Sequence, residues 1–142
     1  MRPAKPPPRP IRAVAGILER DGRILLGKRP PGLLGGLWEP VTADLDDTEE
    51  GPAALVRGFS AKVGLDVQIG KPLGSVLHVF THRRLVLEVF EVHAPNTEEP
   101  RRIVGYEGLR WVDPQGPDVA LSTLARKTLA LVPHRPSTVP GA

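Results

Sequence analysis

The chain has 142 residues, of which 40% are hydrophobic, and its formal net charge is +3. This length and apolar content suit one domain with a core of its own. Cysteine is absent, which excludes disulfides, thiolate metal sites and cysteine nucleophiles. No apolar run reaches the length of a membrane span, and the N-terminus lacks the apolar stretch of a secretory signal. We therefore expect a soluble, cytoplasmic protein without a membrane partner.

The positive charge is concentrated at the N-terminus, and the rest of the chain is close to neutral. Four basic residues fall within the first twelve positions: Arg2, Lys5, Arg9 and Arg12. Residues 1–10 are also rich in proline, which favours an extended linker over packing. A basic tail of this kind suits a polyanion such as nucleic acid, and it equally suits a solubilising linker.

Hydrophobic patterning beyond Pro10 predicts seven strands. The Asp21-Gly22 dipeptide is of the type that closes a strand hairpin, and Thr81–Arg84 is expected to form a second connecting turn. Residues 30–36 and 95–102 are predicted to be loops. The strands are predicted over 11–19, 23–29, 37–45, 66–70, 75–80, 85–92 and 109–112.

Two helices complete the predicted order of elements. Apolar residues four apart predict an amphipathic helix over 50–63, which Gly64 ends. A second helix is predicted over 122–131, with Ser122 as its N-cap. Strands, a helix, more strands and a terminal helix indicate a mixed sheet flanked by helices, an α+β domain built as an α/β/α sandwich. We expect this domain to span 11–132, between a basic linker at 1–10 and a flexible tail at 133–142.

The first predicted helix and its approach resemble the Nudix box. That motif reads Gly, five residues, Glu, seven residues, Arg-Glu-apolar, any residue, Glu-Glu, any residue, Gly-apolar. In the same frame this chain has Ala43 for the first Gly and matches the motif at Glu49, Arg57, Phe59, Gly64 and Leu65. The other three glutamates are replaced by Gly58, Ala61 and Lys62. The segments 23–29 and 32–40 also resemble the second strand of that family and its loop into the box.

The replaced glutamates bear directly on catalysis. Nudix enzymes hydrolyse pyrophosphates with Mg²⁺ or a similar hard cation, held by carboxylates on this helix. Gly58, Ala61 and Lys62 change the local formal charge from −3 to +1, which should repel a divalent cation. Gly58 also weakens a helix by about 1 kcal/mol relative to alanine, which indicates no strong demand for a rigid catalytic helix. We expect no catalytic residue, no metal site and no cofactor.

An acidic cluster does remain before the helix. It comprises Asp44, Asp46, Asp47, Glu49 and Glu50. Carboxylates gathered in one loop could form a displaced metal site. A solvated acidic loop is the simpler interpretation.

Two further segments resemble the C-terminal domain of MutY-type adenine DNA glycosylases. The segment Gly32–Pro40 is similar to the Gly-Leu-Leu-x-Gly-Leu-Trp-Glu-apolar-Pro stretch of that domain, although the apolar residue before Pro40 is missing, which predicts a shifted or kinked strand. The segment His78–Leu85 is similar to its His-x-Phe-Ser/Thr-His hairpin. Residues 109–112 and 120–127 resemble the closing strand and helix, so the resemblance runs from about Ile11 to Val132.

The resemblance implies a Nudix-like fold that lacks hydrolase activity and helps to recognise 8-oxoguanine paired with adenine in DNA. Carried over by position, Phe80, Thr81 and His82 form the loop that reads the lesion. A hydroxyl such as that of Thr81 can both accept and donate a hydrogen bond, and Arg83 and Arg84 are placed to meet phosphates. The alternative is that Phe80 is a core residue and the other four are ordinary turn or solvated residues.

The glycosylase catalytic domain of that family is not in this chain, which has no helix-hairpin-helix segment and no four-cysteine cluster. We therefore expect a noncatalytic DNA-lesion recognition domain in base excision repair. It would be part of a longer glycosylase, itself a hydrolase, or a separate partner of a glycosylase catalytic domain. One alternative is a divergent Nudix hydrolase that uses Mg²⁺ on a nucleoside triphosphate such as 8-oxo-dGTP. A third is a structural or protein-interaction domain.

Overall fold

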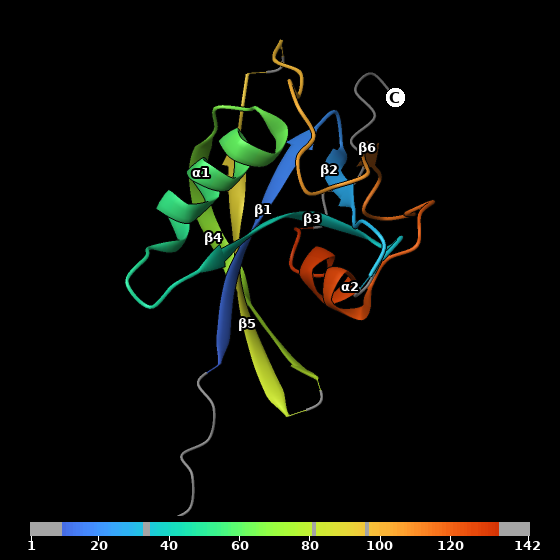
Figure 1. Cartoon of the computed structure of the whole chain (residues 1–142). Helices are drawn as coiled ribbons and strands as arrows, with labels where there is room; N and C mark the ends of the chain where they lie inside the picture. The colour runs from blue at the N-terminus through green and yellow to red at the C-terminus, as the bar shows by residue number, and fades with distance from the viewer. Residues whose placement is uncertain (1–9, 33–34, 81, 96, 134–142) are drawn as a thin grey trace, which may run out of the picture.

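The structure is a computed structural model that describes residues 10–32, 35–80, 82–95 and 97–133, and of Phe80 only the backbone. A mixed six-stranded sheet has the strand order β4-β5-β1-β3-β2-β6. Helix α1 covers one face of the sheet and α2 the other (Figure 1). The elements are β1 (Ile11–Arg20), β2 (Arg23–Lys28), β3 (Trp38–Leu45), α1 (Gly51–Val63), β4 (Gln68–Phe80), β5 (Arg83–His93), β6 (Gly108–Val112) and α2 (Thr123–Leu129).

Strand β1 organises the sheet because it pairs on both sides. It runs parallel to β5, from Ile11 opposite Leu85 onwards, and antiparallel to β3. Its successive side chains point to opposite faces, so Val14 packs in the core beneath α1 while Ala15 packs in the core beneath α2. The sandwich of helix, mixed sheet and helix predicted from the sequence is confirmed.

The predicted turn at Asp21-Gly22 closes the β1–β2 hairpin. Both residues have left-handed backbone angles, with φ of 53° at Asp21 and 77° at Gly22. Two consecutive residues of this kind match the right-handed twist of the flanking strands, and Asp-Gly suits them because both residues tolerate a positive φ. The hairpin prediction is confirmed.

Strand β4 differs from the expectation of two strands over 66–70 and 75–80. It is one strand at the edge of the sheet, with irregular pairing to β5 between Ile69 and Gly74. The break between the two expected strands was inferred from Pro72 and Gly74. Gly74 has a φ of 142°. An edge strand accommodates both residues because its outer side has no ladder to maintain and because a bulge absorbs the distortion.

The two helices begin and end close to the predicted residues. Gly64, with a left-handed φ of 66°, ends α1 and donates to the carbonyl of Ser60. The side chain of Ser122 accepts a hydrogen bond from the amide of Ala125 at 3.0 Å and caps α2, as predicted. Helix α2 is shorter than the expected 122–131. In the part of the chain that the structure describes, no helix is long and apolar enough to cross a membrane.

Close packing of α1 on the sheet gives a stability prediction at Gly16. A Cβ atom at this position of β1 would lie 2.5 Å from Phe59 Cε2 and 2.7 Å from Val92 Cγ2. Gly16→Ala is therefore expected to lower the free energy of unfolding by about 1–3 kcal/mol, the usual cost of overpacking, as measured by urea denaturation. Gly116→Ala is the matched control, since nothing lies within 4 Å of a Cβ atom there. Equal stability of the two variants would contradict the described packing.

Candidate functional site

The hairpin of β4 and β5 contains the residues that the sequence singled out for recognition. It projects from the body of the domain, at the lower end in Figure 1. Phe80 is the last residue of β4, His82 lies in the turn, and Arg83 and Arg84 begin β5. Thr81 lies outside the described residues, as does the side chain of Phe80. The predicted segment is thus brought together at the end of one hairpin.

Arg83 and Arg84 lie on a strand and not in the turn, which corrects the predicted turn Thr81–Arg84. Backbone pairing continues to the end of the hairpin, with Arg84 opposite Val79 and Arg83 opposite Phe80. Neighbouring residues of a strand point to opposite faces, so the two guanidinium groups lie on different sides of the hairpin. Both side chains are exposed, and within the described residues neither has an ion-pair partner. Two exposed cations that have no ion-pair partner among the described residues are therefore available to an anionic ligand.

The hairpin also exposes apolar side chains that the sequence analysis did not single out. Leu77 is 54% exposed and Val79 is 61% exposed. They share the α1 side of the hairpin with Arg84, whereas Val76 and Leu87 on the other side are buried beneath α2. Exposed apolar residues that cluster mark interaction sites more often than scattered ones do. Beyond α1 the hairpin therefore offers a surface that is both apolar and cationic.

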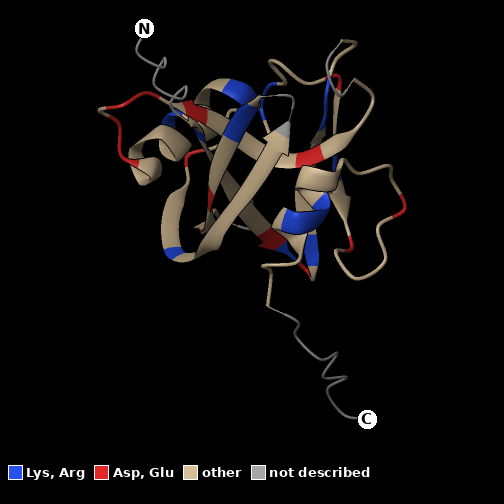
Figure 2. Ribbon diagram, turned by 90° about the horizontal axis from the view of Figure 1, so that it is seen from below, with Lys and Arg blue, Asp and Glu red and all other residues tan. Residues whose placement is uncertain are grey.

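The end of the hairpin itself carries basic side chains and no acidic ones. No acidic residue occurs from 74 to 87. The chain also enters the sheet here, because Ile11 is paired with Leu85, which brings the attachment point of the basic residues in 1–9 to the same end. Those residues themselves lie outside the described part of the chain. Figure 2 views the molecule from this end and shows the basic start of β5 beside the turn.

On helix α1, two of the three positions that lack the family's glutamates, Gly58 and Lys62, make other contacts. The ammonium of Lys62 donates a hydrogen bond to the carbonyl oxygen of Thr42 at 2.6 Å and lies 5.4 Å from the ring centroid of Tyr106. A Cβ atom at Gly58 would lie 3.0 Å from the Cβ atom of Ala43 on β3. Close packing of α1 on β3 thus gives a structural reason for glycine at position 58. These side chains do not fit a divalent cation, which requires several oxygen ligands.

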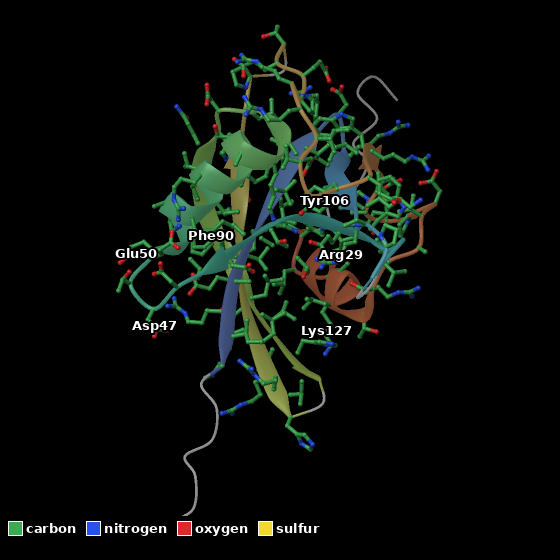
Figure 3. All side chains as sticks on the ribbon, viewed as in Figure 1. Arg29, Asp47, Glu50, Phe90, Tyr106 and Lys127 are labelled. Atoms are coloured by element: carbon green, nitrogen blue, oxygen red, sulfur yellow. The ribbon has the colours of Figure 1, made fainter. Side chains whose placement is uncertain are left out.

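Beneath Lys62 lies a buried carboxylate, Glu39, with a complete set of partners. It accepts hydrogen bonds from Arg29 at 3.1 Å, from the hydroxyl of Thr42 at 2.9 Å and from Tyr106 at 3.4 Å. The hydroxyl oxygen of Tyr106 in turn accepts from the amide of Thr42 at 3.2 Å. Arg29 and Tyr106 lie beside β3 in Figure 3. The network joins the residue that follows β2, strand β3 and the loop before β6.

Burial and the Glu39 carboxylate shape the protonation of this network. Desolvation lowers the pKa of Lys62, while the charges of Glu39 and Asp44 act in the opposite direction. Desolvation, with the charge of Glu39 second, raises the pKa of Tyr106 from 10.0 to about 12. Tyr106 is therefore a neutral hydrogen-bond donor at physiological pH, because burial and the charge of Glu39 disfavour loss of its proton.

The acidic loop before α1 has local roles. Glu49 forms an ion pair with Arg57. Asp46 accepts from both the amide and the hydroxyl of Thr48 at 2.8 Å, and these hydrogen bonds lower the pKa of its carboxyl group. Asp47 and Glu50 lie at the outer end of the loop (Figure 3). Across the described ranges, no three His, Cys, Asp or Glu side chains gather as ligands.

Sequence comparison assigns the family. Residues 13–131 match the family described as NUDIX domain, and the chain belongs to that family. It is 30% identical over 106 residues to the CTP pyrophosphohydrolase of Escherichia coli (strain K12), an alignment that covers 74% of this chain and 77% of that protein. It is also 30% identical over 84 residues to the 8-oxo-dGTP diphosphatase of Proteus vulgaris, covering 58% and 75% of the two chains.

A second kind of relative matches nearly the whole chain. The adenine DNA glycosylase of Mus musculus is 30% identical over 149 residues, which cover 96% of this chain but only 28% of that protein. This chain thus spans little more than a quarter of the glycosylase. The alignment supports homology to a part of a DNA repair enzyme as well as to hydrolases.

Solved structures of both kinds share the fold. The MutT NUDIX hydrolase of Burkholderia pseudomallei superposes with a TM-score of 0.76 and 26% identity, covering 89% of this chain and all of that one. The C-terminal domain of mouse MUTYH, solved in complex with human PCNA, superposes with a TM-score of 0.63 and 25% identity, covering 87% of each chain. The fold agrees with both classes, and the choice between them rests on the site.

Tyr106 provides a direct test of the buried network because it is the only tyrosine in the chain. We expect the tyrosinate absorbance of the folded protein to titrate with a pKa of about 12, and that of the urea-unfolded chain near 10.0. Since the folded state holds this proton more tightly, its contribution to the free energy of unfolding is complete below pH 10 and is lost as the pH rises towards 12. A folded-state titration at the ordinary value would show that Tyr106 is not buried against Glu39.

Proposed function

We propose that this chain is a noncatalytic recognition domain for 8-oxoguanine opposite adenine in DNA, working with an adenine DNA glycosylase catalytic domain in base excision repair. The observation that carries the proposal is a contrast within the fold. The hairpin end presents the exposed cations Arg83 and Arg84, which have no ion-pair partner in the described part of the chain. Helix α1, by contrast, carries Gly58, Ala61 and Lys62 in place of carboxylates. The working surface is then the hairpin.

Each part of the hairpin has a proposed role. Thr81 and His82 read the oxidised base, whose altered edge offers an acceptor at O8 and a donor at N7 that a hydroxyl can match. Arg83 and Arg84 meet phosphates and set the position of the duplex without reading its sequence. Phe80 packs at the base step, and Leu77 and Val79 line the adjoining sugar–phosphate edge.

The domain boundaries proposed from the sequence fit this role. In this proposal residues 11–132 are the recognition unit, residues 1–10 are a basic linker that joins it at Ile11, and residues 133–142 are a tail. Long-range attraction of DNA by the basic residues is electrostatic and independent of sequence. Nearly the whole of this chain aligns with only 28% of an adenine DNA glycosylase, which supports a glycosylase catalytic domain as the partner.

Fluorescence anisotropy with short duplexes tests the assignment of the reading residues. The duplexes carry a single 8-oxoguanine or guanine opposite adenine. We expect the unmodified chain to prefer the lesion, and Thr81→Val and His82→Ala to bring the two affinities together, because they remove the groups that contact the base edge. Equal lesion preference in the variants would reject these two residues as readers, and no preference in the unmodified chain would reject the proposal.

Charge removal at the two arginines is expected to give a different signature. Arg83→Ala and Arg84→Ala should weaken binding to both duplexes alike and should reduce the slope of log K against log salt by about 0.9 for each phosphate that is no longer neutralised. Lys71→Ala is the matched control, since Lys71 is an exposed cation on the same hairpin but far from its end. An equal effect of Lys71→Ala would point to unspecific attraction.

A divergent Nudix hydrolase is the second candidate, and the match to a CTP pyrophosphohydrolase over 77% of that protein favours it. It would need a divalent cation, held by acids around Asp46–Glu50. We expect the purified chain with Mg²⁺ to release no product from 8-oxo-dGTP or CTP. Turnover that depends on Mg²⁺ and disappears in Glu49→Gln would reverse the order of the two candidates.

A further inference from the structure

We propose that this chain has converted the Nudix metal centre into a metal-free joint between α1 and β3, in which Lys62 supplies the positive charge and the Ala43–Gly58 contact sets the spacing. The inference concerns the scaffold and is independent of the proposed DNA recognition. It rests on two pairs of groups that meet at the same place on α1, one electrostatic and one steric.

The electrostatic pair is Lys62 and the acids beneath it. Positions 58 and 62 are four apart, so they share one face of the helix, and this face is turned to β3, where the Lys62 ammonium bonds the Thr42 carbonyl at 2.6 Å. Burial lowers the pKa of Lys62, and the negative charges of Glu39 and Asp44 act in the opposite direction by favouring the charged ammonium. In relatives with glutamates on this helix, a bound metal ion balances the negative charge. In this chain the cation near Glu39 and Asp44 is the ammonium group of Lys62 and not a bound metal ion.

The steric pair is Ala43 and Gly58. The Nudix box has glycine at the first of these positions and glutamate at the second, whereas this chain has alanine and glycine. A Cβ atom at position 58 would lie 3.0 Å from the Cβ atom of Ala43 and 3.9 Å from the carbonyl oxygen of Thr42. The glycine of this contact therefore lies on the helix in this chain, at position 58, and on the strand in the Nudix box, at the position of Ala43. A side chain at 58 is therefore tighter against the Ala43 methyl group than an ordinary van der Waals contact, and α1 or Ala43 must give by a few tenths of an ångström to accept it.

The two pairs together predict how the metal centre can be restored. Gly58→Glu, Ala61→Glu and Lys62→Glu restore the missing carboxylates, and Ala43→Gly restores the room for the first of them. Without metal, the quadruple variant has uncompensated carboxylates next to Glu39 and is expected to unfold at a lower temperature than the unmodified chain. Mn²⁺ should raise its melting temperature by several degrees and leave that of the unmodified chain unchanged.

The matched triple variant keeps Ala43 and differs by one methyl group. We expect it to bind Mn²⁺ about tenfold more weakly than the quadruple variant in calorimetric titrations, a loss typical of a disturbed ligand position. Equal Mn²⁺ affinity of the two variants would overturn the steric coupling. A saturable rise in the melting temperature of the unmodified chain with Mn²⁺ would overturn the metal-free joint.

A milder variant covers the case in which the multiple variants do not fold. Lys62→Met keeps much of the side-chain length and removes only the charge and its hydrogen bond. It is expected to lower the melting temperature more than Lys71→Met, a control at an exposed position. Combined with Glu39→Gln, it should show less than the sum of the two single losses, because each removes a partner of the same interaction. Additive losses, or equal losses at positions 62 and 71, would reject Lys62 as the internal cation.

Discussion

The pairing of β1 with strands on both sides is the constraint on which the rest of the domain depends. The side chains of β1 alternate between the two faces of the sheet, so this strand contributes to both cores, one beneath α1 and one beneath α2. Its parallel ladder with β5 holds the inner strand of the projecting hairpin along its length, and its antiparallel ladder with β3 fixes the surface that α1 covers. Both the hairpin end and the surface beneath α1 are therefore positioned by the same strand.

The local elements could be predicted from the sequence because each has a nearby cause. Asp21-Gly22 tolerates the two positive φ angles of a tight turn, Gly64 ends α1 in the left-handed conformation, and Ser122 caps α2. The single long β4 was not predicted, since Pro72 and Gly74 break a strand in isolation and are accommodated only at a sheet edge. Whether a strand lies at the edge of a sheet is decided by the tertiary fold and cannot be read from the local sequence.

Some features of the candidate site could likewise be predicted from the sequence, and others depend on the folded structure. The motif was enough to predict that the candidate segment around His82 lies on one hairpin, but the register of that hairpin, which sets Arg83 and Arg84 on opposite faces, depends on where the turn falls. The exposure of Leu77 and Val79 was also hidden, because apolar residues in a strand are ordinarily read as core. Nor could the partners of Glu39 be found from sequence, since Arg29 and Tyr106 come from distant segments that meet only in the fold.

The hairpin is preorganised as far as its last pair. Backbone pairing between β4 and β5 extends to Phe80 and Arg83, and β5 is fixed on its other side by β1 from Leu85 onwards. A ligand that approaches this end meets strands whose backbone conformation is already set, so the entropy lost on binding comes mainly from side chains and from the ligand itself. A small interface can then give useful discrimination, because little of the interaction energy is consumed in ordering the protein.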